Sequence, residues 1–264
     1  MELRGSISAR SKTMIFFLGT AAMIASWEAV IRFELMPRSI LPSPFDLVEA
    51  VGPVYYDKAL TRNAFYSTWL NVLSLIEAYA FAFPIGIILG LFSGVRALFE
   101  RHINAARFLP LPALTGLFIK WFGIEDMMKI QFLAFSVFLF LLPQVIQRVD
   151  DVNEIYVQTM YTLGASKWQT IRHVFIPFTL AKSFSDLIVL QAITWTYIVV
   201  AEMVNANAGG VGAMSYLFFR QGKIAMGFIA LAAIIAIGFL LDRIFQVLDK
   251  LFFPFKYAGK KKGM

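Results

Sequence analysis

Six apolar runs, separated by polar segments, constrain the fold of this chain more than any other feature. The runs cover residues 13–31, 67–92, 107–122, 130–146, 186–204 and 224–245. A helix of about 20 apolar residues crosses the ~30 Å hydrocarbon core of a bilayer. Hydrophobic residues make up 59% of the chain and charged residues 16%, a far more apolar balance than in a soluble domain. The sequence therefore predicts an all-α, polytopic membrane protein with about six transmembrane helices in one domain, residues 1–264.

The first apolar run has the general form of a signal peptide, because three basic residues precede it. A signal peptide closes with small residues at a cleavage site, whereas this run ends at Trp27 and Glu28. We therefore expect an uncleaved first helix. A Pro-rich stretch follows, and Ser43, Pro44 and Asp46 have the spacing of a helix start there.

Glycine and proline give the second and third runs special features. Gly86, Gly90 and Gly94 lie four residues apart, which lets another helix approach closely; glycines merely tolerated in a membrane helix are an equal alternative. Pro110 and Pro112 leave backbone carbonyls unpaired near the start of the third run. This run is expected to start broken and to line a cavity or an interface, or else to be a Pro-kinked helix.

The polar segment 150–180 is patterned like two short helices joined by a turn. Gly164 interrupts the first apolar stripe, and Ser166 with Gln169 has the Ser-x-x-Gln pattern of a capping box. Pro177 lacks an N–H and is expected to end the second helix. The first stripe consists of Tyr156, Met160 and Leu163, and the second of Trp168, Ile171 and Phe175.

The basic residues are distributed unevenly between the two sides of a six-span topology. Of the 24 Lys and Arg residues, 16 fall on the side that holds both termini, the 93–107 loop and the segment 150–180, and 8 fall on the other side. Lys and Arg are enriched in cytoplasmic loops. Both termini and the segment 150–180 are therefore expected to be cytoplasmic, and the surplus charge, +7 overall, to face anionic lipid rather than nucleic acid.

Residues 158–177, QTMYTLGASKWQTIRHVFIP, resemble the coupling loop of binding-protein-dependent ABC importer permeases, with its glycine and, thirteen residues later, its proline. In that family the loop docks into a groove of a separate ATPase subunit, and we call residues 150–180 the coupling segment. The family usually has Glu-Ala-Ala where this chain has Gln158-Thr159-Met160, which puts the role of the acidic residue in doubt. The resemblance implies these ATPase-coupling residues: Gln158, Met160, Leu163, Gly164, Ala165, Ser166, Trp168 and Pro177.

Other stretches extend the resemblance over residues 40–245. The LPSP sequence before a short helix is similar to the nitrate, sulfonate, bicarbonate and taurine branch of the family, and Trp121-Phe122-Gly123 and the run WTYIVVAEMVNANAGGVG also match it. The resemblance implies a type I importer permease in the bacterial inner membrane, working by alternating access. Its cargo would be a small anionic solute (nitrate, bicarbonate, a sulfonate or taurine), with a thiamine-precursor pyrimidine as the alternative.

The resemblance also implies the partners. They are two ATPase subunits, which bind ATP and Mg, a periplasmic or lipid-anchored substrate-binding protein, and a second permease copy, most simply in a homodimer. The chain has no G-x-x-x-x-G-K-[ST] sequence to hold a triphosphate, so we expect no cofactor on this chain and no enzyme activity of its own. With no Cys and two His, a metal site is not expected either.

Polar residues in the fifth run are the candidates for the translocation pathway, because such groups at membrane depth usually face a bundle interior or a pathway. They are Gln191, Thr194, Tyr197 and Glu202. Gln191 and Thr194 share a helix face and favour the pathway. For Glu202, a structural group in water at the outer interface is favoured over the pathway. A secondary transporter or channel that uses Glu77 or Glu202 is the alternative function, whereas no set of residues suggests a membrane enzyme.

Overall fold

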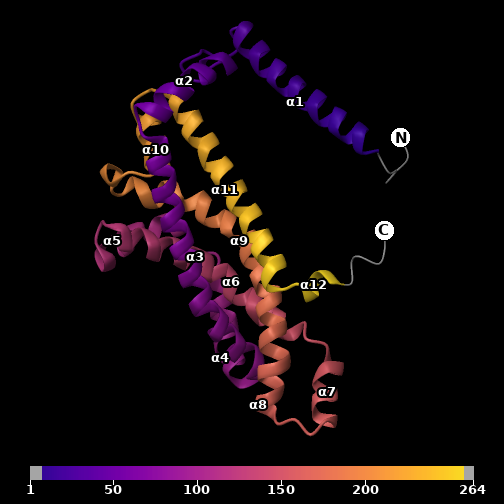
Figure 1. Ribbon diagram of the computed structural model, residues 1–264. Coiled ribbons are helices and arrows are strands. Elements are labelled where there is room, and N and C mark those ends of the chain that lie inside the picture. The colour runs from indigo at the N-terminus through magenta and orange to yellow at the C-terminus, as the bar shows by residue number, and fades with distance from the viewer. Residues whose placement is uncertain (1–7, 259–264) are drawn as a thin grey trace.

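The computed structural model describes residues 8–258, and every regular element in that range is helical. Five of the helices are long and apolar enough to cross a membrane. They are α1 (Ala9–Arg32), α3 (Leu60–Leu91), α6 (Asp126–Asp150), α9 (Ile176–Met203) and α11 (Ile224–Phe252). Figure 1 shows α3, α6, α9 and α11 packed as one bundle, with the coupling segment projecting from one end, the coupling end.

The third expected span, 107–122, is not one helix. Its residues form the 3₁₀ turn η1 (Leu111–Leu114) and the helix α5 (Thr115–Phe122), preceded by α4 (Ser93–Ala106). At ~1.5 Å per residue, the eight residues of α5 extend only about 12 Å, too short to cross a bilayer. Pro110 and Pro112 break the helix here, because proline cannot donate the backbone hydrogen bond that would continue it.

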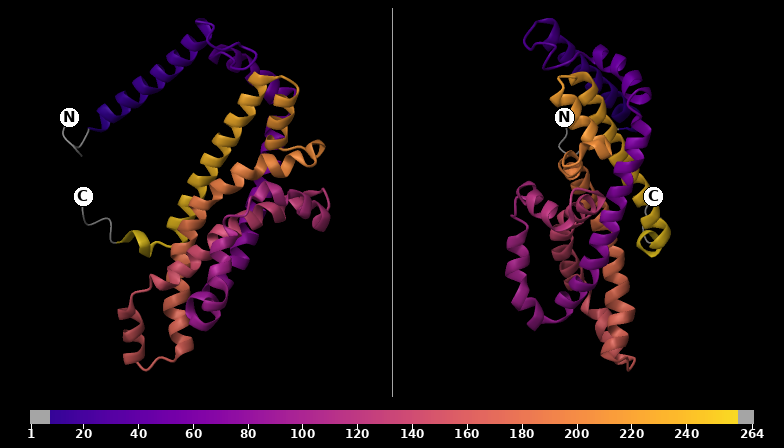
Figure 2. Two further views of the ribbon diagram at one scale, coloured as in Figure 1. Left: turned by 180° about the vertical axis from the view of Figure 1, so that it is seen from behind. Right: turned by 90° about the vertical axis from the view of Figure 1, so that its left-hand side faces the viewer.

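The chain nevertheless crosses between α3 and α6, because these two helices run parallel. Near the far end Lys129 Nζ donates to Tyr66 Oη at 2.8 Å. Toward the coupling end, a Cβ on Gly90 would lie 2.6 Å from Val149 Cβ. Parallel neighbours require a return crossing, and α4, η1 and α5 make it in pieces (Figure 2, right). The described chain thus makes six passages with five full-length helices.

The close approach expected at the second run is present at two of the three glycines. A Cβ on Gly86 would come within 2.5 Å of Val145, and Gly90 meets Val149, whereas nothing lies within 4 Å of a Cβ on Gly94. Gly86 and Gly90 therefore let α3 and α6 pack backbone to side chain. Gly94 lies in α4 and serves no such contact.

The remaining helices lie at the two ends of the bundle. At the far end are α2 (Pro44–Tyr56), η3 (Ala206–Ala208) and α10 (Val211–Arg220); at the coupling end are α7 (Glu154–Thr162), α8 (Lys167–Thr170), the π-turn η2 (Ile171–Phe175) and α12 (Phe255–Ala258). The helix start expected at Ser43 is confirmed: Ser43 N donates to Asp46 Oδ2 at 2.8 Å, and Asp46 N donates to Ser43 Oγ at 3.1 Å. The bond from the Ser43 backbone lowers the pKa of Asp46.

Candidate functional site

The coupling segment is built by local hydrogen bonds. Asn153 Oδ1 accepts from Ile155 N at 2.9 Å and caps the start of α7. At the end of α7, Ala165 N donates to Met160 O at 3.0 Å, and the φ of Gly164 is +78°. This arrangement closes a helix with a left-handed residue, the conformation that glycine reaches without strain. The expected turn between two helices is therefore present at Gly164.

The second helix begins as the sequence indicates. Ser166 N donates to Gln169 Oε1 at 2.7 Å, and Gln169 N donates to Ser166 Oγ at 3.3 Å. These two bonds form the predicted capping box.

The helix does not end at Pro177, and that prediction is wrong. The π-turn η2 precedes Pro177, and the chain stays helical from Lys167 to Met203, over 37 residues. A π-turn bonds each N–H to the carbonyl five residues back, which makes room for a residue that would otherwise clash with the preceding turn. At ~1.5 Å per residue, α8, η2 and α9 form one rod of roughly 55 Å that extends from the coupling segment into the membrane.

Large apolar side chains are exposed around the tip of the coupling segment. The exposed fraction is 55% for Tyr156, 77% for Leu163 and 66% for Trp168. Gln158 and Ser166 are also exposed, whereas Met160 and Ala165 are half-buried. Exposed apolar residues concentrated in one place are typical of a protein-interaction surface. The tip lies beyond the spans, so a subunit outside the membrane can reach it (Figure 1).

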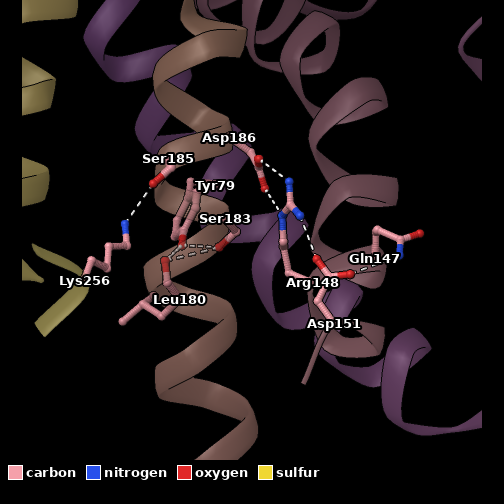
Figure 3. A network of polar contacts seen from close by, with 9 residues as sticks. All are labelled: Tyr79, Gln147, Arg148, Asp151, Leu180, Ser183, Ser185, Asp186 and Lys256. Carbon is pink, nitrogen blue, oxygen red and sulfur yellow. Dashed lines mark hydrogen bonds and ion pairs between the residues drawn. The ribbon is translucent and has the colours of Figure 1, made fainter. Parts of the chain in front are cut away.

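Arg148 joins the coupling segment to the bundle. From α6, its Nε and Nη2 each donate to a carboxylate oxygen of Asp186 on α9 at 2.8 Å, and Nη1 donates to Asp151 at 2.6 Å (Figure 3). The pairing with Asp186 is bidentate, the geometry in which an Arg guanidinium binds a carboxylate most specifically. The bond to Arg148 also lowers the pKa of Asp151. The guanidinium of Arg148 thus links Asp151, at the start of the coupling segment, to Asp186, in the rod that follows this segment.

Two further contacts hold the rod near Asp186. Lys256 Nζ, in α12, donates to Ser185 Oγ at 2.8 Å and pairs with Asp249 at 2.5 Å. On another side of α9, Tyr79 Oη lies 2.8 Å from Ser183 Oγ (Figure 3). Residues 183–186 of the rod are therefore hydrogen-bonded to α3, α6 and α12.

The structure places three of the four candidate pathway residues inside the helical bundle. Thr194 and Glu202 are fully buried, and Gln191 is 4% exposed. Gln191 Nε2 donates to Gly238 O of α11 at 3.3 Å, and Thr194 donates to Asn71 of α3. The shared face of Gln191 and Thr194 is real, but it faces neighbouring helices, so these residues do not line an open pathway here. Tyr197 is half-buried, with its ring centroid 6.1 Å from that of Phe132.

Glu202 has the structural role that the sequence left open. Its Oε2 accepts from Gly212 N at 2.7 Å and Ala213 N at 3.1 Å, and Ser67 Oγ donates to its Oε1 at 2.6 Å. A carboxylate at the N-terminus of α10 satisfies free N–H groups and suits the helix dipole. A Cβ on Gly210 would lie 2.2 Å from the Glu202 carboxyl carbon, so this loop is fitted around the acid rather than free.

Sequence reasoning missed Lys129, which lies just before the fourth apolar run, 130–146. Lys129 lies in the first turn of α6 and its side chain is fully buried. Its Nζ donates to Tyr66 Oη and lies 3.6 Å from Asp126 Oδ1. The i,i+3 spacing of Asp126 and Lys129 hints at this pair. The contact with Tyr66, 63 residues earlier, has no sequence signal.

A cavity of about 560 Å³ lies between α3, α5 and α6. Most of its wall is apolar and aromatic, with Phe118, Trp121 and Phe135 among the lining residues. The polar exceptions are Glu77 and Gln131, whose Nε2 donates to Glu77 Oε1 at 2.6 Å. Glu77 is thus paired with a polar residue on another helix. Within residues 8–258, no three His, Cys, Asp or Glu side chains gather to form a metal site.

Comparison with known proteins agrees with this architecture. The chain is 28% identical to the taurine transport system permease protein TauC of Escherichia coli, over 92% of this chain and 90% of TauC. It is 26% identical to the formylaminopyrimidine transport permease protein ThiX of Halalkalibacterium halodurans, over 78% and 80% of the two chains. It is 23% identical to the bicarbonate transport system permease protein CmpB of Synechocystis, over 89% and 87%.

The fold is shared with a solved transporter. A chain of the MetNI methionine ABC transporter, in an inward-facing conformation, matches with a TM-score of 0.60 at 17% identity, over 71% of this chain and 95% of that one. The family model of the binding-protein-dependent transport system inner membrane component matches residues 82–253, which hold the third passage, the coupling segment, the rod and α11. The chain therefore belongs to this family and is the multi-pass membrane permease of an ABC importer, with the ATPase on a separate subunit.

Proposed function

We propose that this permease moves a small solute of the taurine, sulfonate, bicarbonate or aminopyrimidine class, and that its coupling segment docks directly on the ATPase. The observation that carries the docking site is the exposed apolar tip on a rod continuous with α9. The relatives named for taurine, bicarbonate and formylaminopyrimidine support the solute class. Two copies of this chain form the simplest assembly, because Gln191, Thr194 and Glu202 of α9 are buried inside a single copy. The pathway then runs between protomers.

The proposed mechanism is alternating access through the rod. ATP closes two ATPase subunits, and each carries the tip of one coupling segment with it. Because α8, η2 and α9 are continuous, movement of the tip tilts α9. Arg148 transmits the same movement to α6 through Asp186. The pathway between protomers then opens outward for the binding protein to unload, and hydrolysis of ATP restores the inward-facing state.

The test is transport by the complete importer in liposomes. This permease, its ATPase and its binding protein should together take up taurine or another solute of the proposed class only when ATP is supplied. Omission of the ATPase should abolish uptake, because this sequence has no Walker motif of its own. Uptake driven by a proton gradient without the ATPase would instead identify a secondary transporter.

We also propose that the coupling segment and both chain ends are cytoplasmic. The support is the excess of Lys and Arg on that side, and Figure 1 draws the start of α1 and the end of α11 on one side of the molecule. Since the chain has no Cys, single cysteines give a clean test. Ser166→Cys and Ser11→Cys should be shielded from an impermeant thiol reagent in whole cells, and Ser39→Cys should react. Labelling at Ser166 from outside would reverse the topology.

A further inference from the structure

Glu77 is an acidic group in a cavity that has no basic partner. It lies near the middle of α3, half-buried, and Gln131 Nε2 donates to its Oε1. Among the described residues that line this cavity there is no Lys, Arg or His. A carboxylate at membrane depth is costly when it faces lipid tails, and such groups mark solute or ion pathways by default. One oxygen is held by Gln131, so the other is free to accept from a ligand.

The rest of the wall suits a cation as well. Phe118 has its ring centroid 6.0 Å from that of Trp121 and 5.6 Å from that of Phe135, and all three rings line the cavity. The face of an aromatic ring attracts an ammonium group, most strongly at Trp. A carboxylate and a set of aromatic rings that line one cavity therefore match an amine with a short organic body. Among the described lining residues, no basic side chain is present to pair with an inorganic anion.

We propose that this cavity binds the amine end of the transported solute, so that the substrate is an amine-bearing member of the class. This inference rests on the proposed function and narrows it. Taurine carries an ammonium group and formylaminopyrimidine an uncharged amino group that can donate a hydrogen bond to the carboxylate, whereas bicarbonate, nitrate and simple alkanesulfonates carry neither. Glu77 is the residue that discriminates between them, with Gln131 fixing its orientation.

The experiment uses the purified permease–ATPase complex without binding protein, so that the selectivity of the binding protein does not affect the result. Binding is measured by calorimetry for two matched pairs: taurine against ethanesulfonate, and 4-aminopyrimidine against pyrimidine. At least one amine should bind about tenfold or more tightly than its amine-free partner. Glu77→Gln keeps the size of the side chain and removes its charge, so it should abolish that preference. Glu28→Gln, the same change in α1 away from the cavity, should leave it intact.

The outcomes separate this inference from the proposed function. Equal binding within both pairs, or a preference that survives Glu77→Gln, would overturn the amine site and leave lipid or a second protomer as the occupant of the cavity. ATP-driven uptake by the complete importer, with its binding protein, would still stand in that case. Loss of ATP-driven uptake in the unmodified protein would instead count against the proposed function.

Discussion

Gly164→Val should disconnect the ATPase from the permease while leaving the membrane bundle folded. The φ of Gly164 is +78°, and no atom lies within 4 Å of a Cβ placed there, so any defect arises from backbone strain and not from a clash. A β-branched residue in this conformation costs roughly 1–3 kcal/mol, enough to shift the turn and misdirect α8. We expect at least a tenfold loss of ATPase co-purification, or of the ATPase stimulation by loaded binding protein, in liposomes.

The controls for this prediction follow from backbone geometry. Gly164→Asn should keep most of the coupling, since Asn tolerates the left-handed conformation better than other side chains, and Gly164→Ala should be intermediate. Gly94→Val is the matched control, because a Cβ at Gly94 also meets open space but its φ is ordinary. Unchanged coupling in Gly164→Val would show that the coupling segment does not dock through this turn.

Arg148→Ala should lower the transport achieved per ATP hydrolysed by severalfold. The substitution removes the two bonds to Asp186 and the bond to Asp151, so tip and rod move without carrying α6. Arg148 and Asp186 are 28% and 16% exposed, so solvent screens part of the pairing and the bundle should keep its fold. Uptake and ATP hydrolysis measured in the same liposomes give the ratio.

A double-mutant cycle isolates the Arg148–Asp186 pair. If the pair acts as a unit, Arg148→Ala and Asp186→Ala should each lower the ratio, and the double variant should be no worse than the poorer single variant. Arg148→Lys keeps the charge but not the planar fork, so it should recover only part of the coupling. Fully additive effects would mean that the two residues act separately.

The sequence predicted best what depends on neighbours in the chain. The Ser43 and Ser166 caps follow from side chains that bond the backbone three residues away, and the turn at Gly164 follows from the lack of a Cβ there; all three are present. Helical spacing also placed Gln191 and Thr194 on one face. Such signals need no knowledge of how the helices pack.

The features that the sequence did not predict depend on contacts between segments that are far apart in the chain. Helical periodicity could not say that the face of Thr194 would meet Asn71 on α3 rather than water. Lys129 is buried because Tyr66 lies beside it in space. Proline rules predicted an end at Pro177, yet packing of α9 against α3, α6 and α11 favours continuation of the helix. The π-turn is the local adjustment that resolves this conflict.

The π-turn at Ile171–Phe175 also acts as an angular offset within the rod. Each residue of an α-helix advances the chain by about 100° around its axis. A π-turn holds one residue more than an α-helical turn, so everything after it is rotated relative to everything before it. Trp168, which precedes the π-turn, is exposed, whereas Ile171 and Phe175, which lie within it, are half-buried. Deleting one residue there would keep the rod continuous but would rotate the exposed tip about the rod axis. The apolar side chains of the tip would then no longer face the ATPase on which they are proposed to dock.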